Sequence, residues 1–165
     1  LEHYFVEIGG EVRARGHTLS GFPWRTGIRQ PIEGSATNAL QVAVNLDDYS
    51  LATSGNYENF YVDSTTGFKY AHTLNPHTGY PEKNELLSAS VFATDCGTAD
   101  GFATAFMAMG LDSAYQLASQ HPDLEAYFVY SSAEGALQTK QTAGVAAFLG
   151  SPEKSASTKK EAPNN

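Results

Sequence analysis

One stretch of the sequence carries two of the chain's five histidines: "AHTLNPHTGYP", residues 71–81. Its Asn-Pro, Thr-Gly and Tyr-Pro pairs favour turns and extended backbone. The stretch therefore predicts a rigid loop that holds His72 and His77 in fixed places. An imidazole with an ordinary pKa near ~6.5 can take a proton or donate a hydrogen bond to a phosphate, and it can equally close a structural hydrogen bond between two strands.

A second pair of polar residues lies in "TADGFATAFMAMG", where apolar residues recur at helical spacing. Asp100 and Thr104 are four residues apart, so they share one face of the predicted helix. Their oxygens can share Mg²⁺, which prefers oxygen ligands at roughly 2.0–2.1 Å and usually takes only one or two from protein side chains. Ordinary helix chemistry explains the same pair, because Asp near a helix N-terminus is favourable and Thr bonds back to a carbonyl. The spacing alone leaves both interpretations open.

The elements that must position these residues change from strands to helices and back to strands. Helical spacing begins at Thr98, an expected N-cap, and stops at Gly110; a second helix starts behind Asp112 and ends before Pro122. This order predicts an α+β fold with a mixed or antiparallel sheet and two helices in its second half. The expected strands lie roughly at residues 3–15, 24–30, 39–46, 57–63 and 86–94, and later at "LEAYFVYS", "GALQTK" and "GVAAFL".

Two features of the first strands are interpreted as structural. Gly9-Gly10 lacks the G-x-G-x-x-G spacing of a dinucleotide site and opens no helix, so we expect a bulge or a close backbone approach. Glu11 and Arg13, which follow, could face a ligand. Trp24 lies in an alternating strand, which predicts a core position with its indole N–H hydrogen-bonded nearby.

Composition bounds the fold and excludes several functions. The 165-residue chain is 41% hydrophobic, which predicts one domain over residues 1–150, while "SPEKSASTKKEAPNN", residues 151–165, reads as a disordered polar tail. Acids outnumber bases 18 to 10, which argues against nucleic-acid binding. The single Cys96 excludes an internal disulfide and, by itself, a thiolate zinc site. The sequence has no run of about 18 apolar residues, so no membrane span is predicted.

Four ordered stretches then resemble one family. They are "FVEIGGEVRARG", "LATSGNYENFY", "KYAHTLNPHTGYP" and "TDCGTADGFATAFMAMG", which together span residues 5 to 110. Their order and separations resemble the flavin transferases, the ApbE-like FAD:protein FMN transferases. Gly101 departs from the family pattern, which more often has Ala there. This departure costs up to about 1 kcal/mol of helix propensity and removes no metal ligand.

The resemblance implies chemistry on FAD. Members of the family use Mg²⁺ to split the pyrophosphate of FAD and to transfer FMN to a threonine hydroxyl of an acceptor flavoprotein subunit, with release of AMP. Some members instead hydrolyse FAD to FMN and AMP. A third interpretation is a flavin-binding module without catalysis. The retention of His72, Asp100 and Thr104 favours an enzyme, whereas nothing in this sequence separates transferase from hydrolase.

The resemblance also implies roles for particular residues. His72 matches the family histidine near the pyrophosphate, acting either as a base or as a donor to the phosphate. Thr73 and Leu74 match the part of the loop whose backbone lies against the flavin nucleotide. Asp100 and Thr104 match the side-chain metal ligands of the helix, and a backbone carbonyl from another part of the family fold completes the set.

Ser54, in the Thr-Ser-Gly motif, could lie near the flavin or simply form a turn.

Three further expectations follow from the resemblance. The chain is expected to be the C-terminal half of a larger flavin-transferase fold, with the N-terminal half of the same protein as its partner. That half would carry flavin-binding and further metal-binding elements. Family members are usually exported in bacteria, so a periplasmic location with a lipid anchor to the inner membrane is also expected, although this chain shows no export signal.

The histidine loop gives the first testable prediction. In the protein completed by its N-terminal half, His72→Ala should lower FMN transfer by about 10²-fold or more, the usual loss for a general base. His77→Ala should lower it far less, because His77 stands outside the family motif. Covalently bound FMN on the acceptor measures both rates, and equal losses would mean that the loop acts only structurally.

Overall fold

The structure, a computed structural model, describes residues 1–31, 39–56, 60–62, 69–71, 74, 76, 79–80 and 85–149. A six-stranded antiparallel sheet with strand order β1-β2-β5-β8-β9-β10 forms its centre. Two helices follow β8 in the chain and a 3₁₀ helix follows β10, which confirms the predicted α+β class. The elements are β1 Tyr4–Ile8, β2 Glu11–Arg15, β3 Trp24–Arg29, β4 Leu40–Leu46, β5 Ser50–Gly55, β6 Phe60–Val62, β7 Lys69–Ala71, β8 Leu86–Ala93, α1 Cys96–Met109, α2 Leu111–Gln120, β9 Glu125–Ser131, β10 Leu137–Gln141 and η1 Ala143–Ala147.

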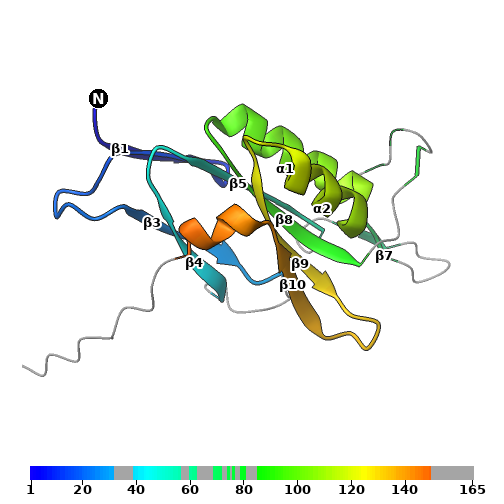
Figure 1. Cartoon of the computed structure of the whole chain (residues 1–165). Coiled ribbons are helices and arrows are strands. Elements are labelled where there is room, and N and C mark those ends of the chain that lie inside the picture. The colour runs from blue at the N-terminus through cyan, green and yellow to red at the C-terminus, as the bar shows by residue number, and fades with distance from the viewer. Residues whose placement is uncertain are drawn as a thin grey trace, which may run out of the picture.

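The sheet separates two apolar layers. Helices α1 and α2 cover one face, and the β3–β4 hairpin with η1 covers the other (Figure 1). Successive strand residues point to opposite faces, so β8 contributes Val91 to the helix layer and Phe92 to the hairpin layer. Both side chains are fully buried. The strand is therefore buried on both faces, as expected for the middle of a three-layer fold.

Aromatic rings fill the centre of each layer. In the helix layer Phe106 packs on Phe128 with ring centroids 5.6 Å apart. In the hairpin layer Phe148 stacks on Phe92 at 4.4 Å and meets Tyr49 edge-on at 4.8 Å. Burying a side chain such as Phe106 contributes about 1.5–3 kcal/mol, so these contacts fix the helices and η1 against the sheet.

The first expected strand, residues 3–15, is two strands. Gly9 and Gly10 have φ angles of 69° and 108°, and they form the two-residue turn of the β1–β2 hairpin rather than a bulge. The prediction was wrong because two glycines with positive φ favour this tight turn, whose twist matches that of the flanking strands. Trp24 is half-buried against Phe5, and its indole N–H donates to the Arg15 carbonyl at 2.9 Å, as expected.

Two further strand assignments need correction. "GVAAFL" was expected to be a strand, yet Ala143–Ala147 is a 3₁₀ helix that places Val145 in the core. Gly144 lets this helix approach Glu125, whose carboxylate accepts a hydrogen bond from the Gly144 N–H at 3.0 Å and another from the Thr142 hydroxyl. Strand β5 was missed, because its sequence "SLATSG" is poor in the large β-forming residues.

Strand β7 was not predicted, and the remaining elements follow the prediction more closely. β3, β4 and β8 lie where strands were expected, and β6 falls within the expected segment 57–63, of which residues 57–59 and 63 lie outside the described part. Helix α2 begins at Leu111 behind the cap residue Gly110, one residue before the expected start. The expected tail, residues 151–165, lies outside the described residues. In the described part of the chain, no helix is long and apolar enough to cross a membrane.

Helix α1 is capped by Asp95 and not by Thr98. The Asp95 carboxylate accepts a hydrogen bond from the Thr98 N–H at 2.8 Å, so the helix begins three residues earlier than expected. Hydrogen bonds from the hydroxyl and then the backbone of Thr98 hold the pKa of Asp95 below its ordinary value. Asp95 is the N-cap because its backbone is extended, with φ −136° and ψ 153°, as an N-cap requires.

The cap gives a prediction for stability against pH. Because folding lowers the pKa of Asp95, its contribution is fully present above the unfolded-state pKa near ~3.9 and is lost as the pH falls through the folded-state pKa. Asp95→Ala should therefore lower the melting temperature at pH 7, by an amount that shrinks below about pH 4. Asp95→Asn should retain most of the cap. Thermal unfolding of the three proteins tests this, and a deficit for Asp95→Ala that stays constant down to low pH would contradict it.

Candidate functional site

Helix α1 and strand β5 bring two of the predicted site residues together. The hydroxyls of Ser54 and Thr104 lie 3.1 Å apart, a hydrogen-bond distance in which either oxygen can be the donor. Ser54 is half-buried near the end of β5, and Thr104 is exposed in the second half of α1. Residues fifty positions apart in the chain thus meet at one edge of the helix layer.

Small side chains explain why two short hydroxyl residues reach one another. Ala52 on β5 and Ala89 on β8 face the helix, and Ala99 and Ala103 on α1 face the sheet. All four are buried, with exposures of 1% or less. Because alanine fills little space, the helix axis lies close to the sheet along this line. Ser54 and Thr104 stand beside these alanines on β5 and α1, where the separation suits a direct hydrogen bond.

Asp100 lies one helical turn before Thr104 and is exposed. Within the described part of the chain its carboxylate makes no hydrogen bond or ion pair, unlike Asp95, which caps the helix, and Asp112, which pairs with Lys140 at 3.3 Å. An exposed carboxylate without a protein partner, one turn from a hydroxyl held by a neighbouring strand, fits a cation that takes its other ligands from phosphate and water.

The described residues hold no group of three or more His, Cys, Asp and Glu side chains that could bind a metal alone. The carboxylate of Asp100 and the hydroxyl of Thr104 are oxygen ligands, which suit Mg²⁺ better than a transition metal. Zn²⁺ sites usually need three or four nitrogen or sulfur ligands from the protein, whereas Mg²⁺ commonly keeps waters and substrate phosphates as ligands. Asp100 and Thr104 therefore fit a magnesium site that substrate and another part of the protein would complete.

The histidine loop falls mostly outside the described residues. His72, Thr73 and His77 all belong to that undescribed part, so their predicted roles stay predictions. Leu74 is described and is 54% exposed, a position open to a ligand or to another segment. Of the six predicted site residues, the structure therefore places Ser54, Asp100 and Thr104 in one region.

Strand β5 has a free edge beside the Ser54–Thr104 pair. Among the described strands, β2 pairs with β5 only at Val12–Leu51 and Arg13–Ser50, so the end of β5 extends beyond β2. The Tyr49 carbonyl accepts a hydrogen bond from β2, and the Asn56 N–H donates a hydrogen bond to β8. The backbone N–H and C=O groups of successive strand residues point to opposite edges of the strand. Within the described part of the chain, the backbone groups of Gly55 therefore face an edge of β5 that no strand covers.

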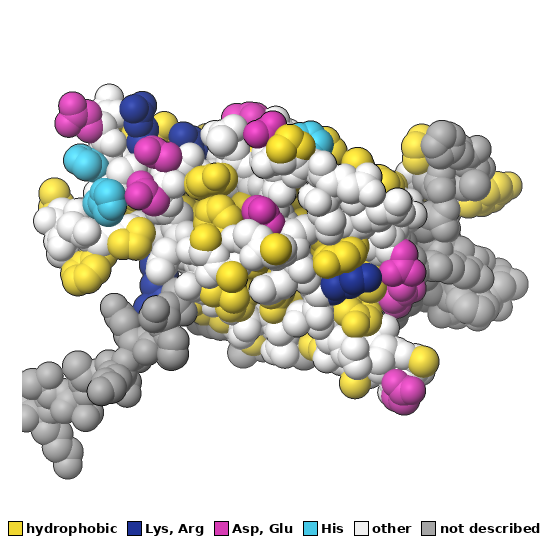
Figure 2. All heavy atoms as spheres, in the orientation of Figure 1, with side chains coloured by type: hydrophobic (Ala, Val, Ile, Leu, Met, Phe, Trp, Pro, Cys, Tyr) yellow, Lys and Arg dark blue, Asp and Glu magenta, His cyan; other side chains and the backbone are white. Residues whose placement is uncertain are grey.

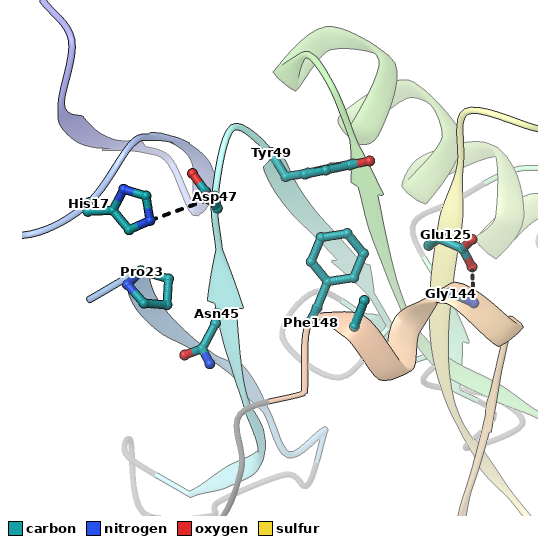
Figure 3. A pocket seen from close by; sticks show the side chains of 9 residues that line it. His17, Pro23, Asn45, Asp47, Tyr49, Glu125, Gly144 and Phe148 are labelled. Carbon is teal, nitrogen blue, oxygen red and sulfur yellow. Dashed lines mark hydrogen bonds and ion pairs between the residues drawn. The ribbon is translucent and has the colours of Figure 1, made fainter. Parts of the chain in front are cut away.

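A separate pocket of about 540 Å³ lies on the opposite face of the sheet (Figure 3). Its apolar wall is the Tyr49–Phe148 pair, and its rim includes His17 and Asp47, whose side chains lie 3.5 Å apart. Sequence reasoning gave no indication of this pocket, because its residues come from separate loops, from β4 and β9 and from η1, outside the four motifs. They are His17, Pro23, Asn45, Asp47, Tyr49, Glu125, Gly144, Ala147 and Phe148.

Among the residues that the structure describes, the charged side chains near the N-terminal end differ from Asp100 in having partners. Figure 2 shows histidines and carboxylates gathered near the N-terminal end, where the rings of His3 and His17 lie 6.4 Å apart and Arg15 pairs with Asp48 at 3.6 Å. The Arg15 and Asp48 charges neutralise one another at the surface. In contrast, the Asp100 carboxylate faces solvent without a partner in the described part of the chain.

The layered α+β fold and the arrangement of Ser54, Asp100 and Thr104 can be compared with known proteins. The profile of the ApbE family matches residues 1–128, which is more than half of the 165-residue chain. The chain therefore belongs to the ApbE family.

Curated relatives and solved structures agree. The FAD:protein FMN transferase of Vibrio cholerae serotype O1 is 41% identical over 110 residues, which cover 67% of this chain and 32% of that protein. The FAD:protein FMN transferase of Haemophilus influenzae is 34% identical over 134 residues, covering 81% of this chain and 38% of that protein. The chain thus spans about a third of the length of these relatives.

Two crystal structures extend the likeness to the fold. The apo flavinyl transferase ApbE of Pseudomonas stutzeri superposes with a TM-score of 0.73 at 33% identity, over 91% of this chain and 44% of that one. The flavin transferase ApbE from Vibrio cholerae gives 0.75 at 32% identity, over 90% and 45%. Nearly the whole of this chain therefore corresponds to somewhat less than half of each solved protein.

Proposed function

We propose that this chain supplies the metal-binding part of a magnesium-dependent FMN transferase, which cleaves FAD and attaches FMN to a threonine of an acceptor flavoprotein. One observation carries the proposal. Asp100 and Thr104 lie one turn apart on α1, and a strand residue holds the Thr104 hydroxyl at 3.1 Å. The curated relatives of this chain are FAD:protein FMN transferases.

The two side chains would divide the work of holding the cation. The Asp100 carboxylate would supply the negative charge, and the Thr104 hydroxyl would supply a neutral oxygen. Mg²⁺ bound there would neutralise the charge that develops on the pyrophosphate during phosphoryl transfer. The chain has a net charge of −8 and no P-loop motif, so local neutralisation of this kind is needed before it can accept a phosphate ligand.

FAD and the acceptor threonine are the only reactants that the FMN transfer needs. The threonine oxygen of the acceptor forms a bond to the FMN phosphorus, the pyrophosphate P–O bond breaks, and AMP leaves. The threonine proton must pass to a base, and His72 is the proposed acceptor because of its place in the family loop. With water in place of threonine, the same bonds would change and free FMN would result.

A second segment would complete the site. The chain corresponds to 44–45% of the length of the solved ApbE structures, and Gly55 presents backbone groups at a free edge of β5 beside Thr104. We propose that the N-terminal half of the same protein packs near this edge and supplies the remaining metal ligand and much of the flavin pocket. Asp100 and Thr104 would then lie between the two halves.

The proposal predicts a specific loss at Asp100. In the protein completed by its N-terminal half, Asp100→Ala should abolish magnesium-supported AMP release from FAD. The free energy of unfolding should change by no more than about 0.5 kcal/mol, since an exposed side chain without partners contributes little to packing. Asp112→Ala is the matched control, because it removes another exposed helical aspartate, on α2.

Chromatography of AMP, free FMN and protein-bound FMN reads out the reaction. Wild-type and Asp112→Ala proteins should form protein-bound FMN, and Asp100→Ala should form none. Turnover by Asp100→Ala equal to wild type would refute the metal assignment. AMP with only free FMN, in the presence of an acceptor, would show a FAD hydrolase, and FAD binding without AMP would show a binding module.

A further inference from the structure

The Thr104 hydroxyl has one proton, and the structure offers it a defined acceptor. A threonine inside a helix ordinarily donates to the carbonyl four residues earlier, here that of Asp100. In this protein the Thr104 oxygen instead lies 3.1 Å from the Ser54 oxygen on β5. The Thr104 hydroxyl therefore has a hydrogen-bond partner on strand β5, outside its own helix.

A hydroxyl that binds a cation must point a lone pair at the cation and its O–H elsewhere. The Ser54 oxygen is placed to accept a hydrogen bond from that O–H. We propose that Ser54 is a positioning residue, which accepts a hydrogen bond from the Thr104 hydroxyl and so fixes the free lone pair of Thr104 toward the cation site beside Asp100. This inference rests on the proposed function, and it assigns Ser54 to the metal site rather than to the flavin.

The backbone around Ser54 is suited to such a role. Ser54 pairs with Ala89 of β8, so its Cα cannot move without disturbing β5 and β8. Its neighbour Thr53 points to the other face, where its hydroxyl lies 2.8 Å from that of the buried Ser90. Two adjacent hydroxyl residues on one strand therefore serve different layers, and Thr53 provides a matched control.

Groups that orient a metal ligand through a hydrogen bond typically change metal affinity by 10–100-fold when they are removed. A residue that only stabilised the helix–sheet contact would change the melting temperature instead. A residue that touched the flavin would change the KM for FAD and leave metal binding alone. Metal affinity measured without FAD therefore separates the three roles.

The experiment measures Mn²⁺ binding by electron paramagnetic resonance of the free ion, using the protein completed by its N-terminal half. Ser54→Ala should weaken Mn²⁺ binding by about 10-fold or more, whereas Thr53→Ala should leave it unchanged. Ser54→Thr, which keeps the hydroxyl, should restore most of the affinity. In a Thr104→Ala background, Ser54→Ala should cause no further loss, because its effect passes through Thr104.

Each other result overturns the inference. Wild-type affinity in Ser54→Ala, or an equal additional loss in the Thr104→Ala background, would show that Ser54 does not act through Thr104. If Ser54→Ala does not fold, Ser54→Cys preserves the size of the side chain with a weaker acceptor and should still weaken binding. If the wild-type protein binds no Mn²⁺, or if Thr104→Ala binds it as well as wild type, the proposed metal site itself fails, and the inference fails with it.

Discussion

The close approach of helix α1 to the central sheet is the constraint on which the candidate site depends. Ala52 and Ala89 on the sheet, and Ala99 and Ala103 on the helix, place only small buried side chains at the part of the contact that lies beside Ser54 and Thr104. A larger residue at any of these positions would force the layers apart, at a typical cost of 1–3 kcal/mol for an overpacked core. It would also separate Ser54 from Thr104, so packing and chemistry are linked through the same line of small residues.

The two ends of α1 show how the helix is held in register along the sheet. Asp95 caps its first turn, and the Gly110 N–H donates to the Phe106 carbonyl at its end. Between them, Phe106 packs against Phe128 of β9. The exposed face of the same helix is left free for Asp100 and Thr104. The buried face therefore sets where the helix lies, and the exposed face carries the polar groups that the proposed reaction needs.

The sequence predicted the fold class and the helix well, since α1 and α2 show helical periodicity and end near glycine or proline. It predicted the first hairpin, β5 and η1 poorly. Gly9-Gly10 fits either a bulge or a turn, and "SLATSG" lacks the large residues that mark a strand. The contact between Ser54 and Thr104 could not be predicted, because it depends on which strand lies beneath the helix. For the same reason nothing local indicated the pocket at Tyr49 and Phe148, whose walls come from distant segments.

The location of the cation site is the central claim, and paramagnetic broadening in nuclear magnetic resonance spectra tests it most directly. Mn²⁺, which accepts the same oxygen ligands as Mg²⁺, would be added with inorganic pyrophosphate to the protein completed by its N-terminal half, with the 165 residues of this chain ¹⁵N-labelled. The account predicts that the amide signals around Asp100, Thr104 and Ser54 broaden first, while those of η1 and β10 stay sharp. Broadening centred instead on Asp47 and Glu125, at the pocket on the opposite face, or spread evenly over the chain, would contradict it.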